Sequence, residues 1–270
     1  MEATQILILS LVQGITEFLP ISSSGHLVLT PLLFGFDLQS LAFDVSVHVG
    51  TLAAVMIYFR KEVARMTLAV LSSLRTRRFE DPDARLGWMI VIATIPVVVL
   101  GLPLKSVLEM LRQDDALIAL VIAGTTIGFG LLLWLADWRG KRTRDEYSLN
   151  WRDALFIGGM QAIAIIPGTS RSGITITAGL MLGLNRQATS RFSFLLSIPT
   201  IIMAGLLETL DLAQSAAPVD WTALLIGAQF SFLVAYLTIH FFLRFIERIS
   251  MLPFVLYRFL LGGVILFLVL

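Results

Sequence analysis

The chain has 270 residues, of which 57% are hydrophobic and only 14% are charged. Soluble domains are roughly 45–50% apolar and about 25% charged, so this composition is typical of an integral membrane protein. The net charge of +1 excludes a strongly basic nucleic-acid-binding protein, and the absence of cysteine excludes disulfides, thiol catalysis and cysteine-ligated zinc. The N-terminus lacks a basic region and a small-residue cleavage site, so we expect it to belong to the mature membrane domain.

Two apolar stretches are interrupted in the middle by proline, serine and glycine. Residues 5–34 break at residues 20–25, and residues 153–183 break at residues 167–173. Each flank is shorter than the roughly 20 residues that a spanning helix needs. The pattern predicts re-entrant segments, each with two short helices joined by a buried loop, and the alternative is an ordinary span with a proline kink.

Six other segments are long and apolar enough to cross a bilayer. In chain order they are residues 41–59, 86–104, 116–136, 190–211, 221–243 and 253–270. The sequence therefore predicts an all-α integral membrane fold with six transmembrane helices and two re-entrant helix–loop–helix segments.

Basic residues are distributed unevenly between the connecting segments. They gather in residues 60–85 and 137–152, whereas residues 105–115 hold only two and residues 212–220 hold none. The positive-inside rule places the first two segments in the cytoplasm and the other two outside. Both termini are then expected outside.

The chain also repeats itself at an offset of 148 residues. The matched pairs are Gln13 with Gln161, Ile15 with Ile163, Ser22 with Ser170, Ser24 with Ser172, and Gly25 with Gly173. Each half holds one broken segment and three spans, and an odd number of spans turns the second half upside down relative to the first. We expect a single membrane domain built from a repeat of about 1–136, a cytoplasmic loop of 137–152 and a repeat of about 153–270.

The first broken segment carries polar groups that are costly to bury in a membrane. Gln13 and Glu17 lie four residues apart, on one helix face, and could hold a divalent cation, with Glu17 alternatively acting as a base. His26 could be a nucleophile or an acid–base group. The candidate hydroxyl groups are Ser22, Ser23 and Ser24, of which Ser23 could also be the nucleophile.

The second broken segment places Arg171 in a loop of small residues. Such residues let backbone N–H groups approach an anion, the following helix presents its positive N-terminus, and the guanidinium group suits phosphate. The accompanying candidates are Gly168, Thr169, Ser170, Ser172 and Thr175, with Ser170 a second candidate nucleophile. If the two loops meet, their side chains suit phosphoryl transfer.

Structural interpretations compete with these roles. Serines in membrane helices often bond only a backbone carbonyl, His26 could be structural, and Glu17 and Arg171 could form no more than a buried ion pair. His48 and His240 have no polar companions nearby in the sequence, so we interpret both as structural. The basic residues other than Arg171 lie mainly in loops or at the ends of spans.

Residues 13–26, QGITEFLPISSSGH, and residues 167–175, PGTSRSGIT, carry a resemblance to a known family. They resemble the (E/Q)xxxE motif with the following SS(S/T)GH, and the PGxSRSxxT motif, of the bacterial undecaprenyl pyrophosphate phosphatases (the BacA/UppP family). The resemblance extends over essentially the whole chain. Position 13 is Gln where many members have Glu, which favours Glu17 as the metal ligand or base.

This resemblance implies a function and a location. The substrate would be undecaprenyl diphosphate, hydrolysed to the monophosphate carrier of peptidoglycan synthesis. It further implies a divalent cation, Mg²⁺ or Ca²⁺, and bacitracin resistance on overexpression. The protein would lie in the bacterial cytoplasmic membrane, and we expect its site to be reached from the periplasmic side.

The sequence also bears on two other possible functions and on the formation of a homodimer. The phosphatidic-acid phosphatase class is disfavoured, because position 177 is Thr where its SRxxxxxH element requires His and no Lys-rich motif precedes residues 22–26. An ion-coupled transporter or lipid flippase is compatible with an inverted repeat. Small-residue faces at Gly124 with Gly128, and at Gly158 with Gly159, could pack within the chain or between chains, which leaves a homodimer open.

Overall fold

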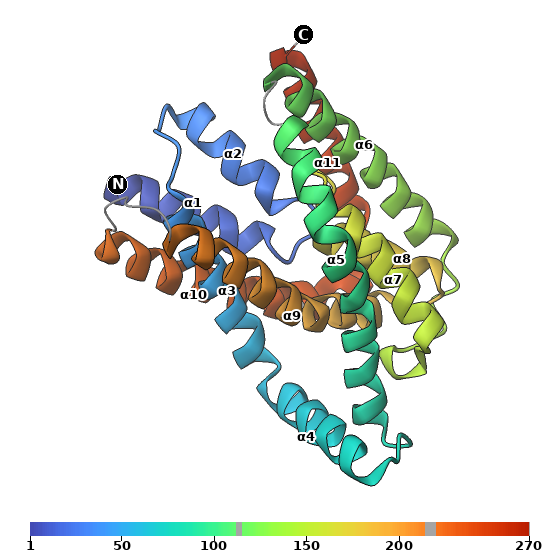
Figure 1. Ribbon diagram of the computed structural model, residues 1–270. Coiled ribbons are helices and arrows are strands. Elements are labelled where there is room, and N and C mark those ends of the chain that lie inside the picture. Colours follow the sequence, from blue (N-terminus) through green and yellow to red (C-terminus); the bar gives the residue numbers. More distant parts are fainter. Residues whose placement is uncertain (112–114, 214–219, 270) are drawn as a thin grey trace.

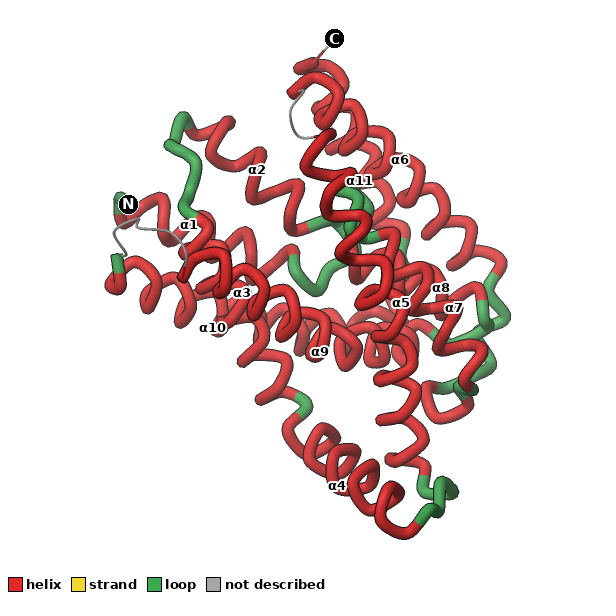
Figure 2. Tube along the Cα trace, viewed as in Figure 1, coloured by secondary structure: helices red, strands yellow, loops and turns green. Residues whose placement is uncertain are grey.

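The computed structural model describes residues 1–111, 115–213 and 220–269, and this part of the chain is helical with no β-strand (Figures 1 and 2). The first half contains α1 (Ala3–Thr16), α2 (Ser23–Phe34), α3 (Leu41–Tyr58), α4 (Arg60–Thr76), α5 (Pro82–Leu111) and α6 (Asp115–Arg139). A short 3₁₀ helix (Glu146–Ser148) precedes α7 (Trp151–Ile163), α8 (Arg171–Met181), α9 (Arg186–Ala213), α10 (Trp221–Ile249) and α11 (Leu252–Val269).

Five described helices are long and apolar enough to cross a membrane: α3, α5, α6, α9 and α10. They cover the first five predicted spans, and α11 is an apolar helix of somewhat shorter length at the sixth. The prediction of an all-α, multi-pass membrane protein is therefore confirmed. The predicted outer segments 105–115 and 212–220 include residues 112–114 and 214–219, which lie outside the described residues.

Both predicted interruptions separate two short helices. The first lies between α1 and α2 and the second between α7 and α8. Ser22 and Ser170 precede α2 and α8, and both have positive φ angles, of 75° and 69°. Positive φ is uncommon for residues other than glycine, so the two loops share an unusual conformation at the positions matched by the sequence repeat.

The two halves pack across each other. Helix α1 of the first half contacts α10 of the second, while α7 of the second contacts α5 of the first. Helices α3 and α10, and helices α6 and α11, form the most extensive contacts. This exchange of partners brings the two interrupted segments to the centre of the bundle (Figure 1).

Helix α4 lies in segment 60–85, for which the sequence predicted a cytoplasmic connection rich in basic residues but no helix. It carries basic residues together with the exposed leucines Leu68, Leu71 and Leu74. Figure 1 shows it leaving the bundle between α3 and α5. Basic and apolar residues on one helix are typical of a helix that lies in the membrane interface.

Candidate active site

The two loops meet through one ion pair. Arg171 Nη2 donates to Glu17 Oε1 at 2.8 Å, although the residues are 154 positions apart in the sequence. Glu17 directly follows α1 and Arg171 is the first residue of α8, so the helix ends position both groups. Arg171 Nη1 also donates to the carbonyl oxygen of Ser193 in α9, at 3.2 Å. The condition for a shared site, that the two loops meet, is thus fulfilled in the structure.

The second oxygen of Glu17 accepts two further hydrogen bonds. Gln13 Nε2 donates to Oε2 at 3.0 Å, and Ser23 Oγ donates to the same atom at 2.8 Å. A hydroxyl group that donates to a buried carboxylate is arranged as a nucleophile with its base. Gln13 is fully buried, and its Oε1 atom has no hydrogen-bond partner.

His48 belongs to this site, and its interpretation as a histidine without polar companions was wrong. Its Nε2 atom lies 3.7 Å from Glu17 Oε2. Its Nδ1 atom lies 2.7 Å from the carbonyl oxygen of Asp44, which must accept, so Nδ1 carries a proton and Nε2 faces the carboxylate. His48 reaches Glu17 only because α3 packs beside α1. In the sequence, the one indication of a functional role was a histidine inside an apolar span. By contrast, His240 contacts aromatic rings.

A pocket of about 680 Å³ opens at the ion pair. Its polar lining residues are Glu17, Ser22, Ser23, Ser24, His48, Gln161, Ser170, Arg171, Thr200 and Glu208. The first residues of α2 and of α8 therefore both face one space. The N-terminus of a helix attracts anions through its free N–H groups and its dipole, so the two helix ends make this pocket a candidate anion site.

Several predicted residues support the loops and do not line the pocket. Ser172 Oγ donates to the carbonyl oxygen of Leu19 at 2.8 Å and so ties the second loop to the first. The Thr175 hydroxyl lies 2.7 Å from that of Ser193. Gly168 has a φ of +83°, which suits glycine, and Thr169 is fully buried.

The structure does not place His26 among the residues that line the pocket. Its Nδ1 atom lies 2.6 Å from the carbonyl oxygen of Ser22, and its Nε2 atom lies 2.5 Å from the hydroxyl of Tyr257 in α11. Its ring also stacks on that of Tyr257. The Nδ1 contact lies within the start of α2, whereas the Nε2 contact and the ring stacking hold α2 against α11.

Comparison with known proteins places this arrangement in a family. The model of the family described as bacitracin resistance protein BacA matches residues 6–264. This chain belongs to the BacA family. It is 55% identical over 269 residues to undecaprenyl-diphosphatase 2 of Stutzerimonas stutzeri (strain A1501), covering 98% of each chain. It is 56% identical over 271 residues to undecaprenyl-diphosphatase 1 of Pseudoalteromonas translucida (strain TAC 125), covering 100% of each.

This BacA-family chain has a second intramembrane arginine that the sequence analysis missed. Arg258 lies within α11 and is 1% exposed. Its guanidinium group donates to the carbonyl oxygens of Pro20, Thr125, Thr126, Gly168 and Thr169. These acceptors include both interrupted loops, so Arg258 fastens the two loops to each other and to α6. An arginine in the middle of an apolar helix was the signal in the sequence.

Replacing Arg258 with methionine is expected to lower the free energy of unfolding by about 3 kcal/mol, the cost of leaving one or two buried carbonyl groups without a donor. Hydrolytic activity should fall as well, because the two loops lose their common anchor. Thermal unfolding in detergent and turnover of the purified variant would measure both effects. The exposed Arg248→Met is the control, and an unchanged melting temperature for Arg258→Met would contradict the anchoring role.

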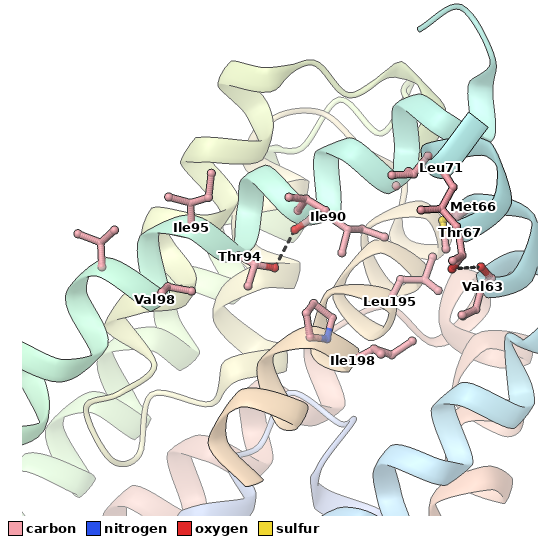
Figure 3. Close-up of a pocket in the computed structure, with 15 residues that line it drawn as sticks. Val63, Met66, Thr67, Leu71, Ile90, Thr94, Ile95, Val98, Leu195 and Ile198 are labelled. Atoms are coloured by element: carbon pink, nitrogen blue, oxygen red, sulfur yellow. Dashed lines mark hydrogen bonds between the residues drawn. The ribbon is translucent and has the colours of Figure 1, made fainter. Parts of the chain in front are cut away.

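A second cavity adjoins the site in this BacA-family chain. It has a volume of about 550 Å³ and lies between α4, α5 and α9 (Figure 3). The hydroxyls of Thr67 and Thr94 donate to the carbonyl oxygens of Val63 and Ile90, so the groove offers an apolar surface. Val98 lines both this groove and the site pocket, which makes the two cavities neighbours across one side chain.

Proposed function

We propose that this chain is an undecaprenyl-diphosphatase, which hydrolyses undecaprenyl diphosphate to the monophosphate and inorganic phosphate. This reaction recycles the lipid carrier of peptidoglycan synthesis and gives bacitracin resistance. The observation that carries the proposal is the Glu17–Arg171 pair, placed in a pocket where the N-termini of α2 and α8 meet. Members of the BacA family at more than 50% identity bear that activity in their names.

The anion site suits a diphosphate. The N–H groups at the starts of α2 and α8 and the hydroxyls of Ser22, Ser24 and Ser170 offer hydrogen bonds to phosphoryl oxygens. Arg171 adds a permanent charge with a planar fork of donors. A bound diphosphate gives the guanidinium group a second anionic partner beside Glu17.

The chemistry proceeds through Ser23 in this proposal. Ser23 Oγ attacks the terminal phosphorus while its proton passes to Glu17, and the bond to the bridging oxygen breaks. The departing prenyl monophosphate takes that proton. Water then attacks the phosphoserine, and Glu17 passes a proton from the water to the Ser23 oxygen as inorganic phosphate leaves. The 2.8 Å contact between Ser23 and Glu17 supports this choice of nucleophile, and His26 serves to position α2.

A divalent cation, Mg²⁺ or Ca²⁺, is part of the proposal. The described residues contain no group of three or more His, Asp or Glu side chains that could hold a metal ion by themselves. Glu17 offers one carboxylate, and the Oε1 atom of Gln13 is a buried oxygen without a partner. These oxygens suit a hard cation, so Glu17 and Gln13 would be the residues that hold it. When bound, the cation would neutralise charge on the phosphoryl oxygens.

The apolar walls of the pocket suit the prenyl chain. Val97, Val98 and Gly101 of α5 face the same space as Ile201 and Ala204 of α9. Beyond Val98, the groove of Figure 3 continues the apolar surface toward α4. The substrate is then held by its diphosphate at the polar end and by its first isoprene units along α5 and α9.

Phosphate release by the purified protein tests the function. With undecaprenyl diphosphate, we expect one inorganic phosphate for each prenyl monophosphate formed, and a phosphoserine at position 23 in acid-quenched protein. Direct attack by water would leave no phosphoserine. A transporter or flippase would move the lipid across vesicles without any phosphate release, and that outcome would reject the enzyme.

The membrane arrangement is also proposed in its finer details. The chain forms one domain with six spans and two re-entrant segments, from inverted repeats of about 1–136 and 153–270 joined by residues 137–152. Segments predicted on one side meet each other, which supports this arrangement: the carbonyl oxygen of Gly183 accepts from Thr143 N, and the N-terminal amine lies 3.7 Å from Asp220. The open surface of α6 at Gly124 and Gly128 is available for a homodimer.

Cysteine labelling will test the orientation in the bacterial cytoplasmic membrane. An impermeant maleimide should modify Leu38→Cys in intact spheroplasts, but should modify Thr76→Cys and Thr143→Cys only after the membrane is opened. All three positions are exposed, and the chain has no native cysteine. We expect this labelling pattern because the excess of basic residues in segments 60–85 and 137–152 favours a cytoplasmic location for both segments. Labelling of both threonine positions from outside would reverse the topology and the proposed periplasmic access to the site.

A further inference from the structure

One amide group in the site pocket has a donor without an acceptor. Gln161 of α7 is 1% exposed and lines the pocket, and its Nε2 atom has no hydrogen-bond partner. Its Oε1 atom lies 3.3 Å from the hydroxyl of Thr200 in α9. Since nearly all buried polar groups in proteins are hydrogen-bonded, an unpartnered amide beside a cavity requires an explanation.

The sequence repeat supplies that explanation. Gln161 corresponds to Gln13, whose Nε2 atom donates to Glu17 four residues later. The residue four positions after Gln161 is Ile165, which also lines the pocket. The second half therefore retains the amide donor but lacks the carboxylate that satisfies it in the first half.

We infer that the Gln161 amide donates a hydrogen bond to the phosphate that is attached to the prenyl chain. This inference rests on the proposed diphosphatase function. Leaving a buried donor unsatisfied costs about 1–3 kcal/mol. A phosphoryl oxygen bound in the pocket would supply the missing acceptor and remove that cost.

The position of Gln161 selects this phosphate rather than the terminal one. Gln161 and Thr200 come from α7 and α9, and the neighbouring apolar lining residues are Ile165, in the loop directly after α7, and Ile201 and Ala204 of α9. The nucleophile pair of Glu17 and Ser23 comes from the α1–α2 segment instead. Gln161 thus marks the side of the pocket where the diphosphate joins its hydrocarbon, and it stabilises charge on the departing monophosphate.

The variants Gln161→Met and Gln161→Glu test this inference. Methionine keeps the size of the side chain but has no donor, so kcat/KM for undecaprenyl diphosphate should fall roughly 10- to 100-fold, the worth of a hydrogen bond to a charged group. The melting temperature of the ligand-free protein should not fall, because methionine removes the buried N–H donor that has no acceptor in that state. Glutamate should be more damaging, because its carboxylate repels phosphoryl oxygens.

Binding of the product provides a readout that needs no turnover. Undecaprenyl monophosphate carries only the phosphate that Gln161 contacts, so its dissociation constant should rise by a similar factor in Gln161→Met. Gln187→Glu, at the exposed start of α9, is the control for an added charge and should behave as the wild type.

Three results would overturn the inference. One is a Gln161→Met variant within about twofold of wild-type kcat/KM, against the 10-fold or greater loss expected. Another is unchanged binding of the monophosphate by that variant. The third is full activity of Gln161→Glu with a lower Mg²⁺ requirement, which would mean that the amide is turned over and its oxygen faces a cation. If wild-type protein releases no phosphate, the proposed function itself fails.

Discussion

Replacing Arg171 with alanine is expected to lower kcat by roughly 100- to 1,000-fold, the usual loss when one donor to a developing charge is removed. The guanidinium group lies at the start of α8, donates to Glu17 and lines the pocket that suits the diphosphate. Its removal also leaves Glu17 as a buried carboxylate without its cationic partner, which destabilises the folded protein. Turnover should therefore be measured on purified, monodisperse protein with its melting temperature.

Arg171→Lys should be impaired nearly as much, although it keeps the charge. Lysine cannot reproduce the two directed contacts that Arg171 makes with Glu17 and the Ser193 carbonyl. The matched control is Arg191→Lys, which alters a similar arginine that pairs with Glu62 and Glu146 away from the pocket. If both Arg171 variants retain more than about a tenth of wild-type turnover, well short of the expected loss, Arg171 is only an ion-pair partner.

Glu17→Gln is the second change with a large expected effect. An amide cannot accept the proton of Ser23 as a base or attract a hard cation, so kcat should fall by roughly 100- to 10,000-fold, the range of general acid–base catalysis. Glu146→Gln is the control, because Glu146 is also buried and also pairs with an arginine. Phosphate release from undecaprenyl diphosphate is the measurement.

Chelation separates the two roles of Glu17. EDTA should abolish wild-type activity, and added Mg²⁺ or Ca²⁺ should restore it. Wild-type protein that stays fully active after exhaustive chelation would remove the cation from the proposal while leaving Glu17 as the base. Glu17→Gln with wild-type turnover would remove both roles.

The sequence predicted the parts of the site that lie within its motifs. Glu17 and Arg171 were candidates for one site on condition that the two loops meet, because a charge in an interrupted apolar segment needs a partner, and the structure joins them at 2.8 Å. The motifs likewise marked Ser23, which the structure places on Glu17. Local spacing and the cost of burying charge were sufficient for these residues.

The residues that were missed depend on contacts between distant helices. His48 reaches Glu17 because α3 packs beside α1, and Arg258 reaches both loops because α11 packs along α6. Nothing in the neighbouring sequence of either residue describes those contacts. The same holds for the fold. The two interruptions could be predicted from the short apolar flanks in the sequence, whereas helix α4 became apparent only in the structure.

The position of Arg258 in α11 has a consequence for biosynthesis. Every proposed catalytic group precedes α11 in the chain, yet the arginine that fastens both loops lies in α11 and is therefore synthesised after all of them. Until α11 inserts, the nascent protein has its full set of reactive side chains, but the loops that carry them lack the Arg258 guanidinium group and keep only their direct contacts with each other. We therefore expect activity to appear only after α11 has been synthesised and inserted, and a chain that ends before Leu252 to insert in the membrane but to be inactive.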